Sequence, residues 1–201
     1  MIRSKSKTIF ITVLLLSALS ACSTSPEPRL YIIEPMDASA STHADEGLII
    51  SVGPVTLPGH LDHKGIVTHD QRYRVNSAEF DRWAEPLGHN ITRALCENLS
   101  LLIPSDQVIA YPLRTPNNVD YSVQVRVIAF GSNPDGQVVL NAAWMIHDAT
   151  DEPVKLAQTR FSAPRRGDDV VALVEVMSLA IEQLSRDIAS AITAASAQSI
   201  E

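Results

Sequence analysis

Two stretches of the chain place their apolar residues at helical spacing, one between residues 80 and 102 and the other between 170 and 192. In both stretches the apolar residues are separated by steps of three and four, which puts them on one face of an amphipathic helix. The first face comprises Phe80, Trp83, Leu87, Ile91, Leu95, Leu99 and Leu102, and the second comprises Val170, Val174, Met177, Ile181, Leu184, Ile188 and Ile192. Asp168 or Asp169 is placed to cap the second helix.

The first helix is interrupted near its start by Pro86 and Gly88. We therefore predict a helical turn opening at Glu79 and Phe80, followed by regular helix from near Pro86, where a missing backbone N–H costs nothing. The helix should end before Pro104, because the residue before a proline disfavours helical backbone.

Strand-like patterns fill most of the remaining chain. They cover residues 30–33, 48–52, 66–69, 73–75, 108–110, 121–130, 138–147 and 154–162. Turn sequences between the last three predict an antiparallel meander. Gly53 to Gly59, which contains two prolines, is predicted to be an extended loop or a sheet edge, and residues 36–46 to be a mobile loop. The pattern as a whole indicates an α+β fold, with two main amphipathic helices packed on a mixed, largely antiparallel sheet.

The N-terminus has the pattern of a lipoprotein signal peptide. Arg3, Lys5 and Lys7 precede an apolar run over residues 9–19, which is too short to span a bilayer of ~30 Å. Small residues then lead to Cys22, as in the motif cut by the lipoprotein signal peptidase. We predict that Cys22 is acylated; a secreted protein cut at an ordinary site near Cys22 is the alternative.

These patterns predict a signal peptide over 1–21, a lipidated leader over 22–28 and one folded domain over 29–197. Ser23 follows the cysteine, as in lipoproteins exported to the outer membrane of Gram-negative bacteria. Removal of residues 1–21 leaves 13 basic and 23 acidic residues, a net charge of about -10. An acidic surface argues against nucleic acid as a partner.

Candidate chemistry is sparse, and no nucleophile, phosphate-loop or dinucleotide motif is present. His60, His63 and His69 are the best candidates for a metal site, but the prolines and glycines around them favour solvated loop histidines. The acidic residues Glu79, Asp81 and Glu85 beside Arg82 are interpreted as a solvated helix face. Trp83 and Trp144 are expected in the core, and Cys96 is interpreted as a small buried hydrophobe. The sequence therefore predicts neither an enzyme nor a cofactor or metal site.

The loop from Val55 to Leu61 is the candidate docking site for a partner. Val55, Leu57, Pro58 and Leu61 place apolar side chains on backbone restrained by proline and glycine, as in many docking anchors. Packing of these side chains over the core is the alternative.

The same region carries a motif that resembles the PqiC-like ABC-type transport auxiliary lipoproteins. Its elements are a strand, a Leu-Pro loop with a following Leu-Asp, an Ile-Val strand, and an F-x-x-W-A-E-P-L segment. The matching residues are Pro54, Leu57, Pro58, Leu61, Asp62, Ile66, Val67, Phe80, Trp83, Ala84, Glu85, Pro86 and Leu87. His60 and His63 stand where an aromatic or basic residue is frequent in the family.

The resemblance implies a non-enzymatic outer-membrane lipoprotein that faces the periplasm and assists an MCE-domain (PqiB-like) protein in moving lipids between membranes. Because MCE proteins form rings and tubes, a homo-oligomer is a further expectation. The main alternative is a periplasmic carrier with an apolar cavity for an acyl chain.

Overall fold

The structure, a computed structural model, describes residues 26–37, 47–71, 73–103, 105, 107–112 and 118–198. The predicted signal peptide, Cys22 and most of the loop predicted over 36–46 lie outside these residues.

A five-stranded sheet forms the centre of the molecule, in the order β5-β2-β6-β7-β8. β5 and β6 both run parallel to β2, and β6, β7 and β8 form the predicted antiparallel meander. The strands are β2 (Ile50–Thr56), β5 (Val108–Ala110), β6 (Tyr121–Ser132), β7 (Gln137–Asp148) and β8 (Pro153–Pro164). In β7, alternate residues from Val138 to Ile146 are buried, whereas those between them are half-buried, so one face of this strand points into the core.

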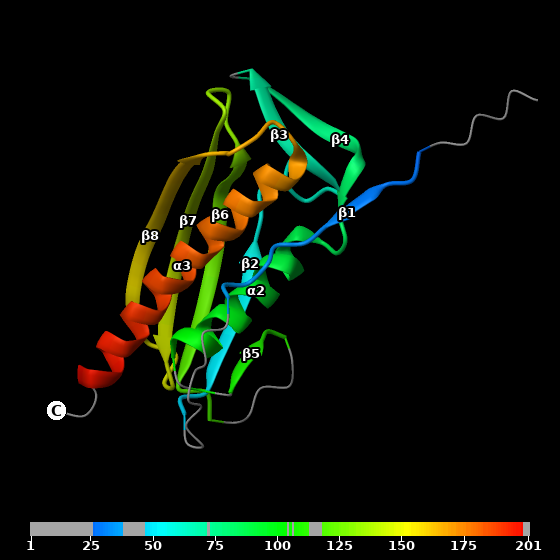
Figure 1. The fold of residues 1–201 in the computed structure, drawn as a ribbon. Helices are drawn as coiled ribbons and strands as arrows, with labels where there is room; N and C mark the ends of the chain where they lie inside the picture. Colours follow the sequence, from blue (N-terminus) through cyan, green and yellow to red (C-terminus); the bar gives the residue numbers. More distant parts are fainter. Residues whose placement is uncertain are drawn as a thin grey trace, which may run out of the picture.

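Two helices lie side by side on that face of the sheet (Figure 1). α2 (Leu87–Leu102) begins directly after Pro86 and ends before Pro104, as predicted. α3 (Val170–Gln198) is capped by Asp169, whose Oδ1 accepts a hydrogen bond of 2.8 Å from the N–H of Ala172. The α+β prediction is thus confirmed. Within the described residues, no helix is both long and apolar enough to cross a bilayer.

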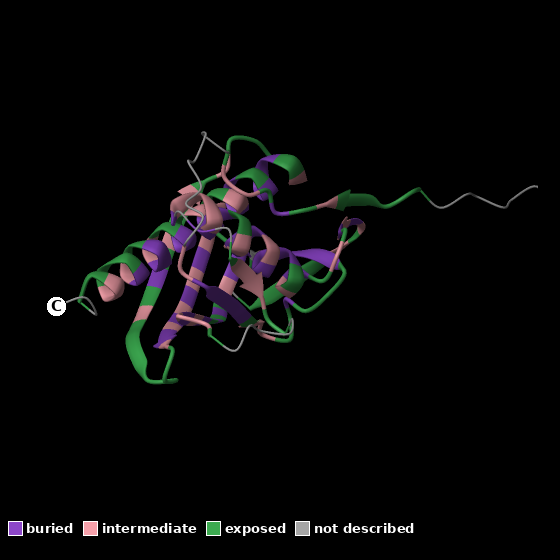
Figure 2. Cartoon of the chain, turned by 90° about the horizontal axis from the view of Figure 1, so that it is seen from below, coloured by how far each residue is buried: buried purple, intermediate pink, exposed green. Residues whose placement is uncertain are grey.

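The core lies where the helices meet the sheet, and the buried residues of Figure 2 concentrate there. From α3 it takes residues predicted by the apolar stripe, including Met177, Ile181, Leu184 and Ile188, each at most 2% exposed. Trp83 and Trp144 are 6% and 4% exposed, as expected for core residues.

Three strands form a second sheet, in the order β1-β4-β3, whereas the sequence pattern had predicted a single sheet. Its strands are β1 (Arg29–Tyr31), β3 (Gly65–Gln71) and β4 (Arg74–Trp83). β3 and β4 form the predicted hairpin, although β4 is longer than expected, and β1 joins β4 in parallel with Tyr31 opposite Trp83.

The predicted helical turn at Glu79 and Phe80 is wrong, because β4 continues through both residues to Trp83. Phe80 and Trp83 are three residues apart, a spacing that suggested a helix face. In the structure Asp81 and Trp83 are both buried, which is the alternation of a strand. β4 pairs with β1, which is distant in sequence, and local periodicity cannot register that pairing.

The prediction of a loop or edge after Val52 is also wrong in part. β2 runs on to Thr56, so a loop does not begin at Gly53. β5 pairs with β2 only from Ile50 to Val52, and Val55 and Thr56 pair with β6 alone, which agrees with the predicted sheet edge. The register between β2 and β6 shifts between Val52 and Val55, so that Gly53 and Pro54 lie outside the regular pairing and the missing N–H of proline is tolerated. Gly53 has a φ of 123°, a conformation that favours glycine.

Candidate docking surfaces

The N-terminal segment, residues 29–37, runs between α2 and α3 and is fixed to both (Figure 1). Asn90 Oδ1 on α2 accepts a hydrogen bond of 2.9 Å from the N–H of Ile33, and Asn98 Oδ1 accepts one of 2.7 Å from the N–H of Met36. On α3, Ser178 Oγ accepts a bond of 3.1 Å from the N–H of Glu34. The segment is therefore an integral part of the helix layer.

The two asparagines are 0% exposed and lie two turns apart, about 12 Å, along α2. Asn98 Nδ2 also donates to Ser185 Oγ of α3 at 3.0 Å, and Arg93 Nη2 donates to the carbonyl of Ile33 at 2.6 Å. Asn90 Nδ2 has no partner among the described contacts. Buried amides thus join the N-terminal segment, α2 and α3 where an apolar face alone was predicted.

β1 is held to β4 by a charged group at its first residue. Arg29 donates from Nε and Nη2 to the two carboxylate oxygens of Asp81 at 2.7 and 2.8 Å, and the Tyr31 hydroxyl donates to Oδ1 at 2.9 Å. The hydrogen bond from Arg29 holds the pKa of Asp81 below its ordinary value. Asp81 is 8% exposed, so its interpretation as part of a solvated helix face was wrong.

The predicted docking loop is divided between core and surface. Leu61 is 3% exposed and belongs to the core, so core packing, the alternative interpretation, describes this residue. Val55 and Leu57 are half-buried against the core, and Pro58 is half-buried beside them. Val55 and Leu57 border a depression of about 210 Å³. Docking through Val55, Leu57 and Pro58 stays a prediction, whereas Leu61 presents almost no surface.

The residues of the WAEPL motif fall at the junction of β4 and α2. Trp83 and Leu87 are buried, Phe80 is half-buried, and Pro86 is exposed at the N-terminus of α2. Ala84 and Pro86 border a depression of about 360 Å³ that also includes Leu30, which is 63% exposed. The motif thus combines core residues with exposed ones.

The three candidate metal ligands do not form a cluster. The rings of His60 and His69 lie edge to face with their centroids 6.2 Å apart, and His69 Nδ1 is 3.2 Å from the carbonyl oxygen of Ser132. His63 is exposed in the loop. Among the described residues, no group of three His, Cys, Asp or Glu side chains is arranged to hold a metal ion.

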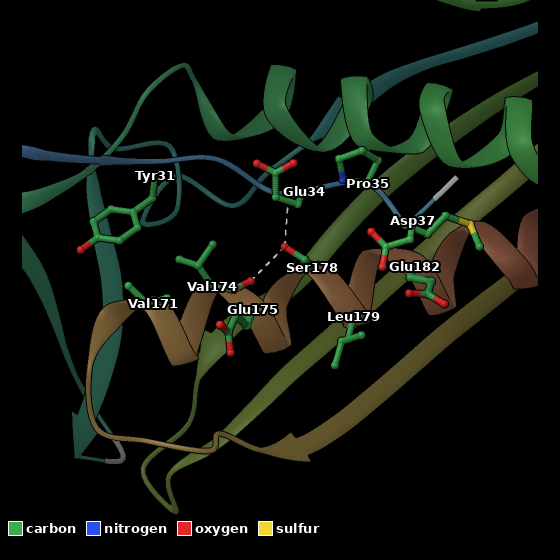
Figure 3. A pocket seen from close by; sticks show the side chains of 11 residues that line it. Tyr31, Glu34, Pro35, Asp37, Val171, Val174, Glu175, Ser178, Leu179 and Glu182 are labelled. Atoms are coloured by element: carbon green, nitrogen blue, oxygen red, sulfur yellow. Dashed lines mark hydrogen bonds between the residues drawn. The ribbon is translucent and has the colours of Figure 1, made fainter. Parts of the chain in front are cut away.

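A groove of about 470 Å³ lies between the N-terminal segment and α3 (Figure 3), and we call it the α3 groove. Its apolar residues include Met36, Val171 and Leu179, and its carboxylates are Glu34, Asp37, Glu175 and Glu182. This groove was not predicted, because Val171 and Leu179 lie off the predicted buried face of α3. The sequence did contain a signal for the groove, namely these two large apolar residues outside the predicted buried face of α3.

A family model described as the ABC-type transport auxiliary lipoprotein component matches residues 31–189. The intermembrane transport lipoprotein PqiC of Escherichia coli (strain K12) is 29% identical over 133 residues, which cover 64% of this chain and 68% of PqiC. PqiC of Shigella flexneri matches to the same extent.

Two crystal structures share the fold. One, of an uncharacterized protein, has a TM-score of 0.70 at 20% identity and covers 83% of this chain and 99% of its own. The other, of a Xanthomonas campestris protein, has a TM-score of 0.69 at 12% identity and covers 85% and 99%. The family model spans the chain from β1 into α3, and the chain belongs to the ABC-type transport auxiliary lipoprotein family.

Proposed function

We propose that this protein is a non-enzymatic adaptor in an MCE-type system that moves lipids between the two membranes of a Gram-negative envelope. Acylated Cys22 anchors it to the outer membrane, and the folded domain contacts the periplasmic end of an MCE-domain protein. The observation that carries the proposal is the family match over residues 31–189, together with a relative that is named for intermembrane transport.

The attachment of the N-terminal segment supports the anchoring role. Five residues lie between Cys22 and Pro28, and even when fully extended the chain from one to the other spans only roughly 20 Å. Because Arg29, Ile33 and Met36 are hydrogen-bonded to β4 and α2, little further chain is available as tether. An acylated Cys22 would therefore keep the domain close to the membrane surface.

The packing of α3 favours an adaptor over a lipid carrier. A carrier in which α3 and the sheet enclose an acyl chain requires an apolar cavity of roughly several hundred Å³ between them. Instead, Ile181, Leu184 and Ile188 are 0% exposed and fill the space between the helix and the sheet. The α3 groove is large enough, but its four carboxylates oppose burial of an acyl chain.

The test is crosslinking in intact envelopes, followed by affinity purification of the acylated protein and identification of both proteins and lipids by mass spectrometry. The adaptor predicts recovery of an MCE-domain protein without stoichiometric lipid. Leu57→Glu should reduce that recovery, because Leu57 borders the depression of about 210 Å³ in the candidate docking surface. Leu156→Glu, a change of the same kind at a residue that is 73% exposed on β8, should not reduce it.

An unanchored Cys22→Ala form provides the second comparison. The proposal requires this form to leave the membrane fraction and to recover less of the MCE-domain protein. Stoichiometric lipid on the unanchored form, with no MCE-domain protein recovered by the acylated form, would establish the carrier instead.

A further inference from the structure

One stripe of α3 is left uncovered by the rest of the described fold. Val171 and Leu179 are 52% and 53% exposed, in contrast to the apolar residues of the buried face. Glu175 lies midway between them and is also exposed. At spacings of four residues the three side chains follow one another along the helix, so α3 presents a surface that is apolar at both ends and acidic in the middle.

The opposite wall of the groove is the N-terminal segment, which the structure holds in place. The backbone N–H groups of Glu34 and Met36 are bound by Ser178 and Asn98 (Figure 3 shows the first of these bonds). Met36 is half-buried and lines the groove. Because this wall is already ordered, a ligand would bind without the entropic cost of ordering it.

The charge of the groove is of one sign. Glu34, Asp37, Glu175 and Glu182 contribute carboxylates, and the described lining includes no Lys or Arg. Glu182 is paired with Arg186 on the same helix at 2.7 Å. An apolar floor with a carboxylate rim complements a segment that carries apolar side chains flanked by Lys or Arg.

We propose that the α3 groove binds a cationic amphipathic helix of a partner protein. Apolar side chains of that helix pack on Val171 and Leu179, and its basic residues pair with the carboxylates at the rim. The lining of α3 from Val171 to Glu182 extends about 16 Å, the length of roughly three helical turns. This is the helix-in-groove mode of recognition, in which residues three and four apart serve as anchors.

Neither the adjoining chain nor a lipid matches the groove as well. After Asp37 the sequence continues as ASASTHADE, which contains no Lys or Arg. An acyl chain would cover the apolar residues but would leave the carboxylates desolvated and without cations. The α3 groove is distinct from the surface formed by Val55, Leu57 and Pro58, and its proposed ligand does not depend on the identity of the transport partner.

The experiment uses the whole chain from residue 22 with Cys22→Ala and a dye-labelled synthetic helix of about three turns, with leucines on one face and flanking lysines. Binding is followed by fluorescence anisotropy. We expect Leu179→Asp and Glu175→Lys each to raise the dissociation constant of the peptide about tenfold or more, as for residues at the centre of an interface. A peptide with glutamates in place of the lysines should not bind measurably.

Two matched variants separate the groove from the general acidity of the protein. Glu152→Lys changes the net charge as Glu175→Lys does, at an exposed residue before β8, and Leu156→Asp removes an exposed leucine elsewhere. Both should bind the peptide as the parent chain does. Equal binding by all four variants would overturn the proposal, as would equal binding of the acidic peptide.

Other occupants would produce different results. The groove would be assigned to lipid if a fluorescent fatty acid bound the parent chain and Glu175→Lys equally well but did not bind Leu179→Asp. Self-association of the parent chain in sedimentation, lost in both groove variants, would assign it to a second copy. Either result without peptide binding would overturn the proposal, and circular dichroism of each variant verifies that it is folded.

Discussion

Leu57 and Leu61 belong to one short loop but differ in what surrounds them. Leu61 is 3% exposed, whereas Leu57 is half-buried. We therefore expect Leu61→Ala to lower the free energy of unfolding by about 2–5 kcal/mol, the usual cost of truncating a buried leucine. Leu57→Ala should cost clearly less. Urea denaturation of both variants measures the difference, and equal losses would show that Leu57 is as much a part of the core as Leu61.

Asp81 makes the attachment of β1 sensitive to acid. Arg29 holds the folded-state pKa of Asp81 below its ordinary value of 3.8. Since the pKa is lower in the folded state, the stabilisation is complete above the unfolded-state pKa and is lost as the pH falls through the folded-state pKa. We expect Asp81→Asn to be less stable than the parent at neutral pH, with a difference that shrinks in acid.

Thermal unfolding at neutral pH and at several pH values below 4 measures this difference. Asp135→Asn, the same substitution in the turn before β7, corrects for the general effect of acid. A difference between parent and Asp81→Asn that does not change with pH would contradict the role given to the Arg29 pair.

Single residues were predictable where burial follows local pattern. Trp144 and the α3 stripe from Val174 to Ile192 fall on apolar periods, and the structure buries them. Trp83 is buried as well, but on strand β4 rather than on the helical period that predicted it. Asp81 was not predictable, because its partner Arg29 is 52 residues away. The burial of Leu61 also depends on segments distant in sequence, so nothing in the local pattern distinguishes Leu61 from Leu57.

At the scale of elements, α3 has a cap that can be tested directly. The sequence left Asp168 and Asp169 as alternatives, and Asp169 bonds the N–H of Ala172. Asp169→Ala should lower the free energy of unfolding by about 0.5–2 kcal/mol. Asp168→Ala should have a smaller effect, because the Asp168 side chain is exposed and lies 3.4 Å from Arg165. Denaturant titration compares them; the reverse order would reassign the cap.

The attachment of the N-terminal segment to α2 should be visible in hydrogen exchange. Asn98→Ala removes two hydrogen bonds of the Asn98 amide, one accepted from the N–H of Met36 and one donated to the hydroxyl of Ser185. We expect a loss of about 1–3 kcal/mol, the cost of a buried polar group left unpaired, and faster exchange at Met36. Ser178→Ala is the control, since it releases the exposed N–H of Glu34. Unchanged exchange at Met36 would show that packing alone holds the segment.

Elements could be predicted from the sequence where one chain segment determines its own structure. The bounds of α2 follow from Pro86 and Pro104, and the meander follows from its turns. β1, the continuation of β2 past Pro54 and the division into two sheets depend on pairings between distant segments. The α3 groove is of this kind too, because its two walls come from opposite ends of the described chain.

At the scale of the whole molecule, the reactivity of Cys96 can report unfolding. Burial raises the pKa of the Cys96 thiol to about 12. Because the thiolate is the reactive form, we expect iodoacetamide to modify folded protein at pH 8 far more slowly than unfolded protein. With Cys22→Ala, Cys96 is the remaining cysteine. Its labelling should rise with urea together with the loss of circular dichroism; labelling at lower urea would reveal local opening of α2.

The position of α3 in the chain determines when the fold can be completed. All strands of both sheets precede α3 in the sequence, and the 29 residues of this helix supply a large share of the side chains that cover the five-stranded sheet. A chain that stops after β8 therefore lacks the residues that close its core, even though it contains every strand of the two described sheets.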